Sequence, residues 1–239
     1  MKRYGNLYDT IISLDNLRLA DNRARRRKCH TYGVKLHDRN REENLQQLHE
    51  QLKSGTYRTS AYSTFTIHEP KERLIFRLPY FPDRIVHHAV MNILEPIWVA
   101  TFTADTYSCI KGRGIQAAAD RVRKTIDRDK PGCAYCLKID VKKFYPSINH
   151  AILKNIVRRR IKDTRLLRLL DEIIDSAEGL PIGNYLSQYL ANLMLTYFDH
   201  WIKEQKRVRY YFRYADDIVV LHHDKKYLRE LLAEIEDYL

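Results

Sequence analysis

Apolar residues along most of the chain recur at helical spacing. Leu45, Leu48 and Leu52 fall on one face of residues 40–53, and Gly55 follows, so the pattern predicts a helix that ends before this glycine. The same spacing predicts further helices over 4–20, 84–98, 115–127, 150–160, 164–177 and 184–205, and a last one through 228–235 to the end of the sequence. We expect the helix over 84–98 to stop near Pro96.

Short runs of strand-forming residues separate these helices, at 56–68, 73–80, 137–141, 210–213 and 218–221. The last two runs flank Tyr214-Ala215-Asp216-Asp217, which predicts a tight hairpin with two acids at its tip. Helices combined with a small antiparallel sheet packed on them indicate an α+β fold.

The charge of the chain indicates a polyanionic partner. The 239 residues, enough for one large domain or two packed subdomains, include 42 Lys and Arg and 30 Asp and Glu, a formal net charge of +12. Such a balance favours nucleic acid first and an anionic membrane second. The basic run over 23–28 fits either a nucleic-acid contact or a solvated helix end.

Other residue groups narrow the class of protein. The apolar runs are shorter than the roughly 18 residues of a membrane span, and no apolar leader follows Met1, so we expect a cytoplasmic protein with no membrane partner. Cys133 and Cys136 have CxxC spacing without a second close pair, which favours buried or half-buried thiols over a zinc site. The pairs His87-His88 and His222-His223 are read as surface or core histidines.

The acids at strand ends are the candidate chemistry. Asp140 closes the strand over 137–141, where a lone Asp usually caps the next turn. However, Asp216 and Asp217 stand at the end of another strand, and we expect the two strands to be neighbours in one sheet. Carboxylates that repel one another at one place favour divalent cations, so the set predicts two Mg²⁺ ions for phosphoryl transfer.

These acids lie in blocks that resemble the reverse transcriptases. Asp140 stands in Lys-Ile-Asp-Val-Lys-Lys-Phe-Tyr-Pro-Ser-Ile, and Asp216 of the Tyr-Ala-Asp-Asp block follows 76 residues later. The stretch from Arg77 through Leu94-Glu-Pro-Ile resembles the family's fingers motif, and Tyr107–Gly114 resembles the block that follows it. The resemblance runs from about residue 45 to the end and implies an RNA-directed DNA polymerase that extends a primer on template RNA with dNTPs.

The resemblance implies the fingers and palm of a right-hand polymerase. We expect residues 1–100 to be mainly fingers, 101–149 and 179–239 palm, and 150–178 a helical insertion between them. The sequence ends 22 residues after Asp217. We therefore expect no primer grip or thumb in this chain, and poor retention of template and primer.

One block points to a subclass. Ile182-Gly183-Asn-Tyr-Leu-Ser187-Gln188 resembles the reverse transcriptases of diversity-generating retroelements, whereas group II intron enzymes carry Gln-Gly-x-x-x-Ser-Pro at this place. That class makes error-prone cDNA, with errors at template adenines, and works with a small basic accessory protein. A group II intron or retron enzyme is the nearest alternative.

The resemblance also implies residue roles at the metal and the sugar. Asp140, Asp216 and Asp217 are expected to bind Mg²⁺, for which Mn²⁺ can substitute, with Asp217 contributing less directly. The backbone carbonyl of Val141 would face the metal-bound triphosphate. Tyr145 matches the steric gate that rejects the ribose 2′-hydroxyl; an ordinary core tyrosine is the alternative.

Further roles concern the incoming nucleotide and the template. Three basic residues are expected to neutralise the triphosphate: Lys71, Arg73 and Arg77. The alternative for each of them is an ordinary charged residue on the surface. Contacts near the nascent base pair are expected from Ile182, Gly183 and Gln188, and template contacts from Arg113, Ser187 and Tyr214. Because an alkyl group replaces an amide at Ile182, we hypothesise looser selection of the incoming base.

Three other classes fit the acids less well. A palm-type nucleotidyl cyclase needs no fingers blocks, and a viral RNA-dependent RNA polymerase usually has an acid at the place of Tyr145 and glycine at that of Ala215. A non-catalytic nucleic-acid-binding scaffold tolerates loss of the acids, yet all three remain.

Overall fold

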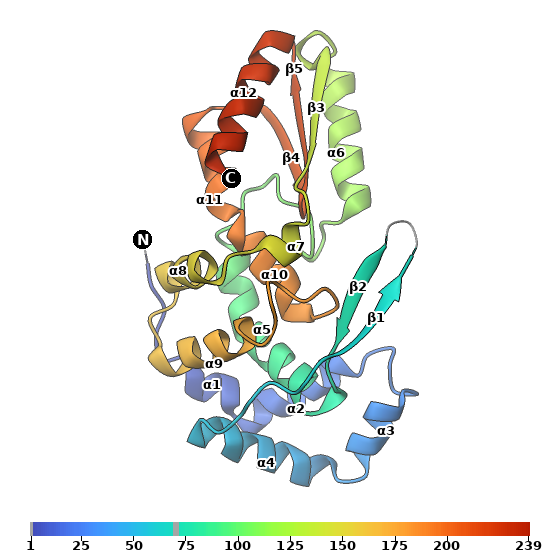
Figure 1. Cartoon of the computed structure of the whole chain (residues 1–239), viewed down its shortest axis with the longest axis vertical. Coiled ribbons are helices and arrows are strands. Elements are labelled where there is room, and N and C mark those ends of the chain that lie inside the picture. Colours follow the sequence, from blue (N-terminus) through green and yellow to red (C-terminus); the bar gives the residue numbers. More distant parts are fainter. Residues whose placement is uncertain (1, 69–71) are drawn as a thin grey trace. The chain divides into compact units, whose positions relative to one another are not determined.

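The computed structural model of the protein describes residues 2–68 and 72–239 (Figure 1). The chain folds into two compact units. The first, called the N-terminal unit here, comprises Met1–Trp98 and Tyr145–Leu190. The second, called the sheet unit, comprises Val99–Phe144 and Ala191–Leu239. Lys71, one of the predicted triphosphate ligands, lies outside the described residues.

The N-terminal unit is mainly helical. Its helices are α1 (Tyr8–Ile12), α2 (Leu14–Ala24), α3 (Tyr32–Asp38), α4 (Arg41–Ser54), α8 (His150–Arg160) and α9 (Thr164–Ile174), joined by most of α5 (Ile85–Val99) and α10 (Tyr185–Met194). The helix predicted over 4–20 is broken at Ser13, whose hydroxyl accepts a hydrogen bond from the Asn16 amide and so begins α2. Helix α4 ends as predicted, because Gly55 takes a φ of 74°.

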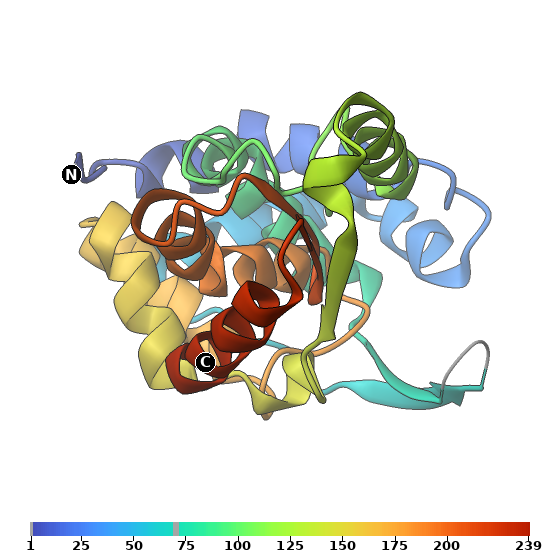
Figure 2. The same ribbon diagram turned by 90° about the horizontal axis from the view of Figure 1, so that it is seen from above.

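Two strands extend from the helices of this unit as a hairpin (Figures 1 and 2). Strand β1 (Ser63–Ile67) pairs antiparallel with β2 (Arg73–Arg77), so both strands are shorter than predicted. Opposite residues of a ladder share a face. Because Ser63 pairs with Arg77 and Ile67 with Arg73, the two arginines lie on the same face of the hairpin.

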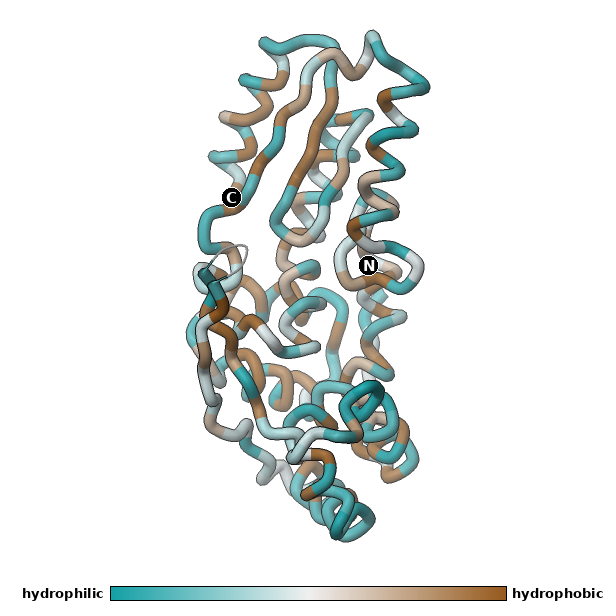
Figure 3. Tube along the Cα trace, turned by 90° about the vertical axis from the view of Figure 1, so that its right-hand side faces the viewer, coloured by the Kyte–Doolittle hydropathy of each residue, from teal (hydrophilic) through white to brown (hydrophobic). Residues whose placement is uncertain are grey.

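The sheet unit is built on three antiparallel strands in the order β3-β5-β4. They are β3 (Tyr135–Asp140), β4 (Tyr210–Tyr214) and β5 (Asp217–His222), which confirms the predicted hairpin and the neighbouring strand. Helix α12 (Lys225–Tyr238) covers one face and α6 (Ile115–Arg128) the other (Figure 1). The central strand β5 is the most hydrophobic of the three, whereas both helices alternate in hydropathy (Figure 3), as expected for a strand buried between two amphipathic helices.

The long helix predicted over 184–205 is interrupted. Helix α10 ends at Met194, α11 spans Thr196–His200, and a π-helical turn follows over Trp201–Gln205. Leu195 has a ψ of 1°, and the Thr196 hydroxyl donates to the carbonyl of Asn192 at 3.1 Å. A threonine that bonds back to the preceding turn bends a helix, which apolar spacing does not register.

Smaller differences concern helix ends and cysteines. Helix α5 continues past Pro96 to Val99, and α9 stops at Ile174 rather than 177. The sequence reading missed α3 and the short α7 (Phe144–Ser147). Cys136, expected to be at least half-buried, is exposed, whereas Cys133 is half-buried.

Candidate functional site

A row of three side chains crosses the end of the sheet. Asp140, the last residue of β3, lies opposite Asp217, the first residue of β5. Tyr214, the last residue of β4, lies opposite the same Asp217 on its other side. Directly opposite residues project from the same face of an antiparallel sheet. The ladder therefore places two acids that are far apart in the sequence on adjacent strands.

Asp216 stands beside this row, on the turn. The residues Ala215 and Asp216 form the two-residue connection between β4 and β5, and Ala215 takes a φ of 54°. A two-residue hairpin turn requires positive φ, which is unfavourable for alanine by itself. The Arg213 guanidinium donates to the Ala215 carbonyl at 2.9 Å, so the turn has a support of its own.

Arg213 is held by a carboxylate that the sequence reading missed. Both Arg213 and Asp199 have no exposed surface, and the guanidinium contacts both carboxylate oxygens, at 2.7 and 2.5 Å. Asp199 also accepts from the hydroxyls of Tyr211, at 2.6 Å, and Thr106, at 3.1 Å. Burial lowers the pKa of Arg213, but the Asp199 charge outweighs it and raises that pKa above its ordinary value.

The same network fixes the loop before α6. The backbone of Arg213 exchanges hydrogen bonds with Asp105 and Tyr107, both at 2.9 Å, so this loop pairs beside β4. Arg113, a predicted template contact, donates from one guanidinium nitrogen to the carbonyls of Thr103 and Thr106, each at 3.0 Å. Part of the Arg113 guanidinium is therefore engaged in folding its own loop.

The charge balance of the acidic row involves Lys138. Its ammonium lies 3.7 Å from the Asp217 carboxylate, on the face that also carries Asp140. Within the described part of the chain, no three Asp, Glu, His or Cys side chains converge as a ligand set for a metal ion. The chemistry of the carboxylates nevertheless suits a metal ion. The two opposed carboxylates repel each other, and a hard divalent cation would relieve this repulsion, as the Lys138 ammonium does in this structure.

The described nucleotide contacts other than Val141 belong to the N-terminal unit. Val141 is half-buried just after β3 in the sheet unit. The carbonyl of Tyr145 in α7 accepts from the Leu180 amide at 2.8 Å. Gly179 takes a φ of 60°, and a Cβ there would lie 2.5 Å from the Tyr145 carbonyl oxygen. The loop that leads to Ile182 is thus fixed against the backbone of Tyr145.

The other end of this loop lies on β2. The Phe76 amide donates to the Ile182 carbonyl at 2.8 Å. Gly183 takes a φ of 119°, and a Cβ there would lie 2.5 Å from the Phe76 carbonyl oxygen, so this position requires glycine. The loop therefore brings Ile182 and Gly183 onto the strand that carries the exposed Arg73 and Arg77.

Helix α10 presents its two predicted contacts differently. Gln188 is exposed, whereas Ser187 is only 4 % exposed and has little surface to offer a template. Among the helices of residues 2–68 and 72–239, none is both long and apolar enough to cross a membrane.

The chain is similar in sequence to several known proteins. The chain is 29 % identical over 176 residues to protein YkfC of Escherichia coli (strain K12), covering 67 % of this chain and 46 % of that protein. It is 25 % identical over 178 residues to the group II intron-encoded protein LtrA of Lactococcus lactis subsp. cremoris, covering 69 % and 29 %. Nuclear intron maturase 4 of Arabidopsis thaliana is 23 % identical over 179 residues, covering 70 % and 22 %. The chain thus spans less than half the length of these relatives.

The fold has a solved counterpart. A chain of a partial Cas6-RT-Cas1–Cas2 complex superposes with a TM-score of 0.51 at 23 % identity, covering 96 % of this chain and 41 % of that chain. Residues 68–239 match the family described as reverse transcriptase (RNA-dependent DNA polymerase), whose members generally use divalent metal ions such as Mg²⁺. With its acids aligned at the end of the sheet, the chain belongs to the reverse transcriptase family.

Proposed function

We propose that this chain polymerises DNA on template RNA, adding dNTPs to the 3′-hydroxyl of a primer in the cytoplasm. The observation that carries the proposal is the pairing of Asp140 with Asp217 next to Asp216 on the turn. We assign residues 1–100 mainly to the fingers, 101–149 and 179–239 to the palm, and 150–178 to a helical insertion between them. A catalytically weak nucleic-acid-binding fragment is the non-polymerase alternative.

The roles follow from this assignment. Asp140, Asp216 and Asp217 would hold two Mg²⁺ ions, or Mn²⁺ in their place, with the Val141 carbonyl beside them. Bound there, the ions would activate the 3′-hydroxyl and stabilise the leaving pyrophosphate. The ring of Tyr145 would exclude a ribose 2′-hydroxyl.

Basic side chains and a glycine are proposed to contact the triphosphate and the nascent base pair. Lys71 and Arg73 would neutralise the triphosphate, since a charged guanidinium or ammonium stabilises phosphoryl transfer. Gly183 would let the loop backbone approach the nascent pair, next to Gln188 of α10.

Primer extension on an RNA template tests the activity. Wild type is expected to extend the primer with dNTPs and Mg²⁺, and Asp216→Ala/Asp217→Ala to extend nothing although it still binds the primer–template. Wild-type protein that binds the primer–template without extending it would overturn the polymerase proposal and favour the binding fragment.

We further propose the diversity-generating class, in which a small basic accessory protein is a partner. Ile182, with Ser187 and Gln188, supports it. Sequenced cDNA should then carry errors concentrated at template adenines, and Ile182→Gln should reduce them. The relatives LtrA and intron maturase 4 instead support a group II intron-type enzyme. A low error rate that Ile182→Gln does not change would favour that alternative.

A further inference from the structure

The N-terminal unit contains a cavity of about 680 Å³, whereas the acids of the candidate site belong to the sheet unit. Helix α3, the start of α4 and the segment from Arg77 to Arg84 line this cavity. Its volume is in the range of clefts that hold one small ligand. Three arginines contribute to its walls, and none of the described lining residues is Asp or Glu: Arg39, Arg77 and Arg84.

These arginines lack counter-ions among the residues that the structure describes. Arg84 is half-buried, and this burial is the main cause that lowers its pKa. The charge of the nearby Arg77 lowers the pKa of Arg84 further. In the same way burial and then Arg84 lower the pKa of Lys28. Cations that depress one another's pKa create a positive potential that an anion would relieve.

A neighbouring histidine reports the same potential. Burial lowers the pKa of His88 to about 4, with Lys28, Arg23 and Arg84 acting in the same direction. The basic run over 23–28, which the sequence left open between a solvated helix end and a nucleic-acid contact, thus continues toward the cavity through Lys28.

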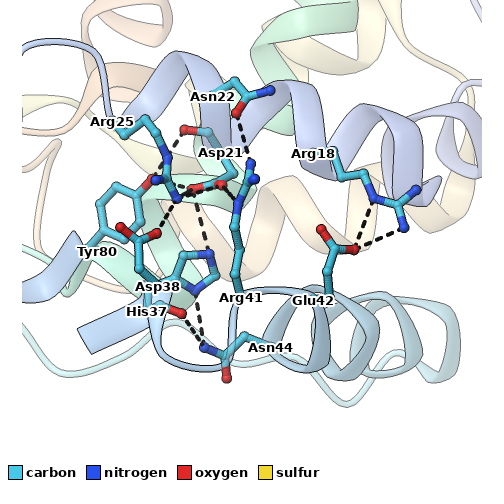
Figure 4. A network of polar contacts seen from close by, with 10 residues as sticks. All are labelled: Arg18, Asp21, Asn22, Arg25, His37, Asp38, Arg41, Glu42, Asn44 and Tyr80. Carbon is cyan, nitrogen blue, oxygen red and sulfur yellow. Dashed lines mark hydrogen bonds and ion pairs between the residues drawn. The ribbon is translucent and has the colours of Figure 1, made fainter. Parts of the chain in front are cut away.

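Two nearby arginines show the contrast. Asp21, fully buried in α2, accepts from Arg25 at 2.8 Å and from Arg41 at 2.6 Å (Figure 4). Its carboxylate also accepts from the hydroxyl of Tyr80, a cavity-lining residue. Among the described residues, an acid thus pairs with Arg25 and Arg41, outside the cavity lining, and none pairs with the arginines that line the cavity.

The cavity also has aromatic walls. His37 stacks on Phe81 with ring centroids 5.3 Å apart, which fixes one wall. Tyr32 is 77 % exposed and Leu36 is 48 % exposed at the rim, although both line the cavity. Unpaired arginines beside an exposed ring are the combination by which proteins hold single-stranded nucleic acid, through phosphate contacts and base stacking.

We propose that this arginine cavity binds single-stranded RNA, with a phosphate between Arg77 and Arg84 and a base stacked on Tyr32. That the strand is RNA rests on the proposed function. The basic residues extend along the surface from Lys28 through Arg26 and Arg27, all exposed, which suits a strand of several nucleotides better than a single dNTP. Arg77 then serves the strand instead of the triphosphate.

The test is binding of a short fluorescein-labelled single-stranded RNA, followed by anisotropy without Mg²⁺ or dNTP. Arg77→Gln/Arg84→Gln should weaken binding about tenfold or more, and should reduce the slope of log affinity against log salt by about 0.7 for each phosphate that the variant no longer neutralises. Tyr32→Ala should weaken binding roughly 5- to 150-fold, as expected when one base stack is removed, and Tyr32→Phe should not.

The matched control removes the same charge elsewhere. Lys225 and Arg229 are exposed on α12, outside the N-terminal unit, and Lys225→Gln/Arg229→Gln should bind RNA nearly as wild type does. Circular dichroism melting checks that all variants fold. Replacing Arg77 and Arg84 relieves repulsion between them, so their melting temperature should not fall.

Two results would overturn the proposal. One is an Arg77→Gln/Arg84→Gln variant that binds the RNA as tightly as the α12 control. The other is a variant with unchanged RNA binding whose KM for dNTP rises in primer extension, which would make the cavity a triphosphate site. The binding assay needs no catalysis. If the protein extends no primer but still binds RNA through Arg77 and Arg84, the result counts against the polymerase proposal and not against the RNA-binding cavity.

Discussion

Arg213 and Asp199 form a bidentate ion pair with no solvent contact. Arg213 lies two residues before Ala215, at the start of the hairpin turn that carries Asp216. The pair joins β4 to α11, and a further guanidinium nitrogen of Arg213 reaches the Ala215 carbonyl at 2.9 Å. The turn that presents Asp216 is thereby tied to the core of the sheet unit rather than only to its own strands.

Breaking this pair should destabilise the protein strongly. Arg213→Gln leaves Asp199 buried without its cation, for which we expect a loss of about 3–5 kcal/mol in the free energy of unfolding. Tyr211→Phe removes one hydroxyl donor to Asp199 and should lose only about 1.5 kcal/mol. Urea denaturation measures both. If Arg213→Gln does not fold, Arg213→Met/Asp199→Leu should recover part of the loss, because it removes both charges. Equal stability of Arg213→Gln and wild type would contradict this account.

The opposed acids should make stability depend on Mg²⁺. At a concentration ten times its Kd, bound Mg²⁺ should add about 1.4 kcal/mol to the free energy of unfolding of wild type. Asp140→Asn/Asp217→Asn should lose this response, and should itself be no less stable without metal because like charges directly opposite destabilise a sheet. Thermal melting with and without Mg²⁺ measures both effects. If Mg²⁺ raises the melting temperature of the double variant as much as that of wild type, the metal assignment is wrong.

Tyr145 should control sugar selection. Tyr145→Ala removes the ring proposed to clash with a 2′-hydroxyl, so the ratio of kcat/KM for dNTP over rNTP should fall roughly tenfold or more. Tyr145→Phe keeps the ring and should keep the ratio. Single-nucleotide incorporation measures both, and an unchanged ratio in Tyr145→Ala would leave the residue as an ordinary core tyrosine.

Buried histidines should make the protein sensitive to mild acid. Burial lowers the pKa of His87 to about 3, below its ordinary value of 6.5, and His87 is only 2 % exposed. Below about pH 6.5 the unfolded chain therefore binds more protons than the native one, so stability falls as pH falls, by up to about 1.4 kcal/mol per pH unit for each such histidine.

Replacement of His87 tests this. His87→Leu should make stability fall less steeply between about pH 6.5 and pH 5, a window above the ordinary pKa of carboxyl groups. The slope should not vanish, because the pKa of His88 is also lowered, to about 4. Urea denaturation across this range measures the slope. A slope equal to that of wild type would show that His87 takes up its proton without unfolding.

Much of the local structure could be predicted because it is encoded locally. The strand-forming runs over 210–213 and 218–221 with acids between them predicted the β4–β5 hairpin, which the ladder confirms. Helices α4, α6 and α8 follow from apolar spacing and end within a residue or two of prediction. The helices predicted over 4–20 and 184–205 break where Ser13 and Thr196 bond to backbone, since such competition leaves the apolar period unchanged.

The sequence by itself determined the family blocks, the strand ends that carry Asp140, Asp216 and Asp217, and a surplus of positive charge. Only the tertiary structure decided that Asp140 stands opposite Asp217, that Asp199 neutralises Arg213, and that Arg77 and Arg84 share a cavity without an acid among its described lining residues. The reason is physical. Hydrophobic period and turn chemistry act over a few residues, whereas strand register and the pairing of buried charges depend on segments that meet only when the chain has folded.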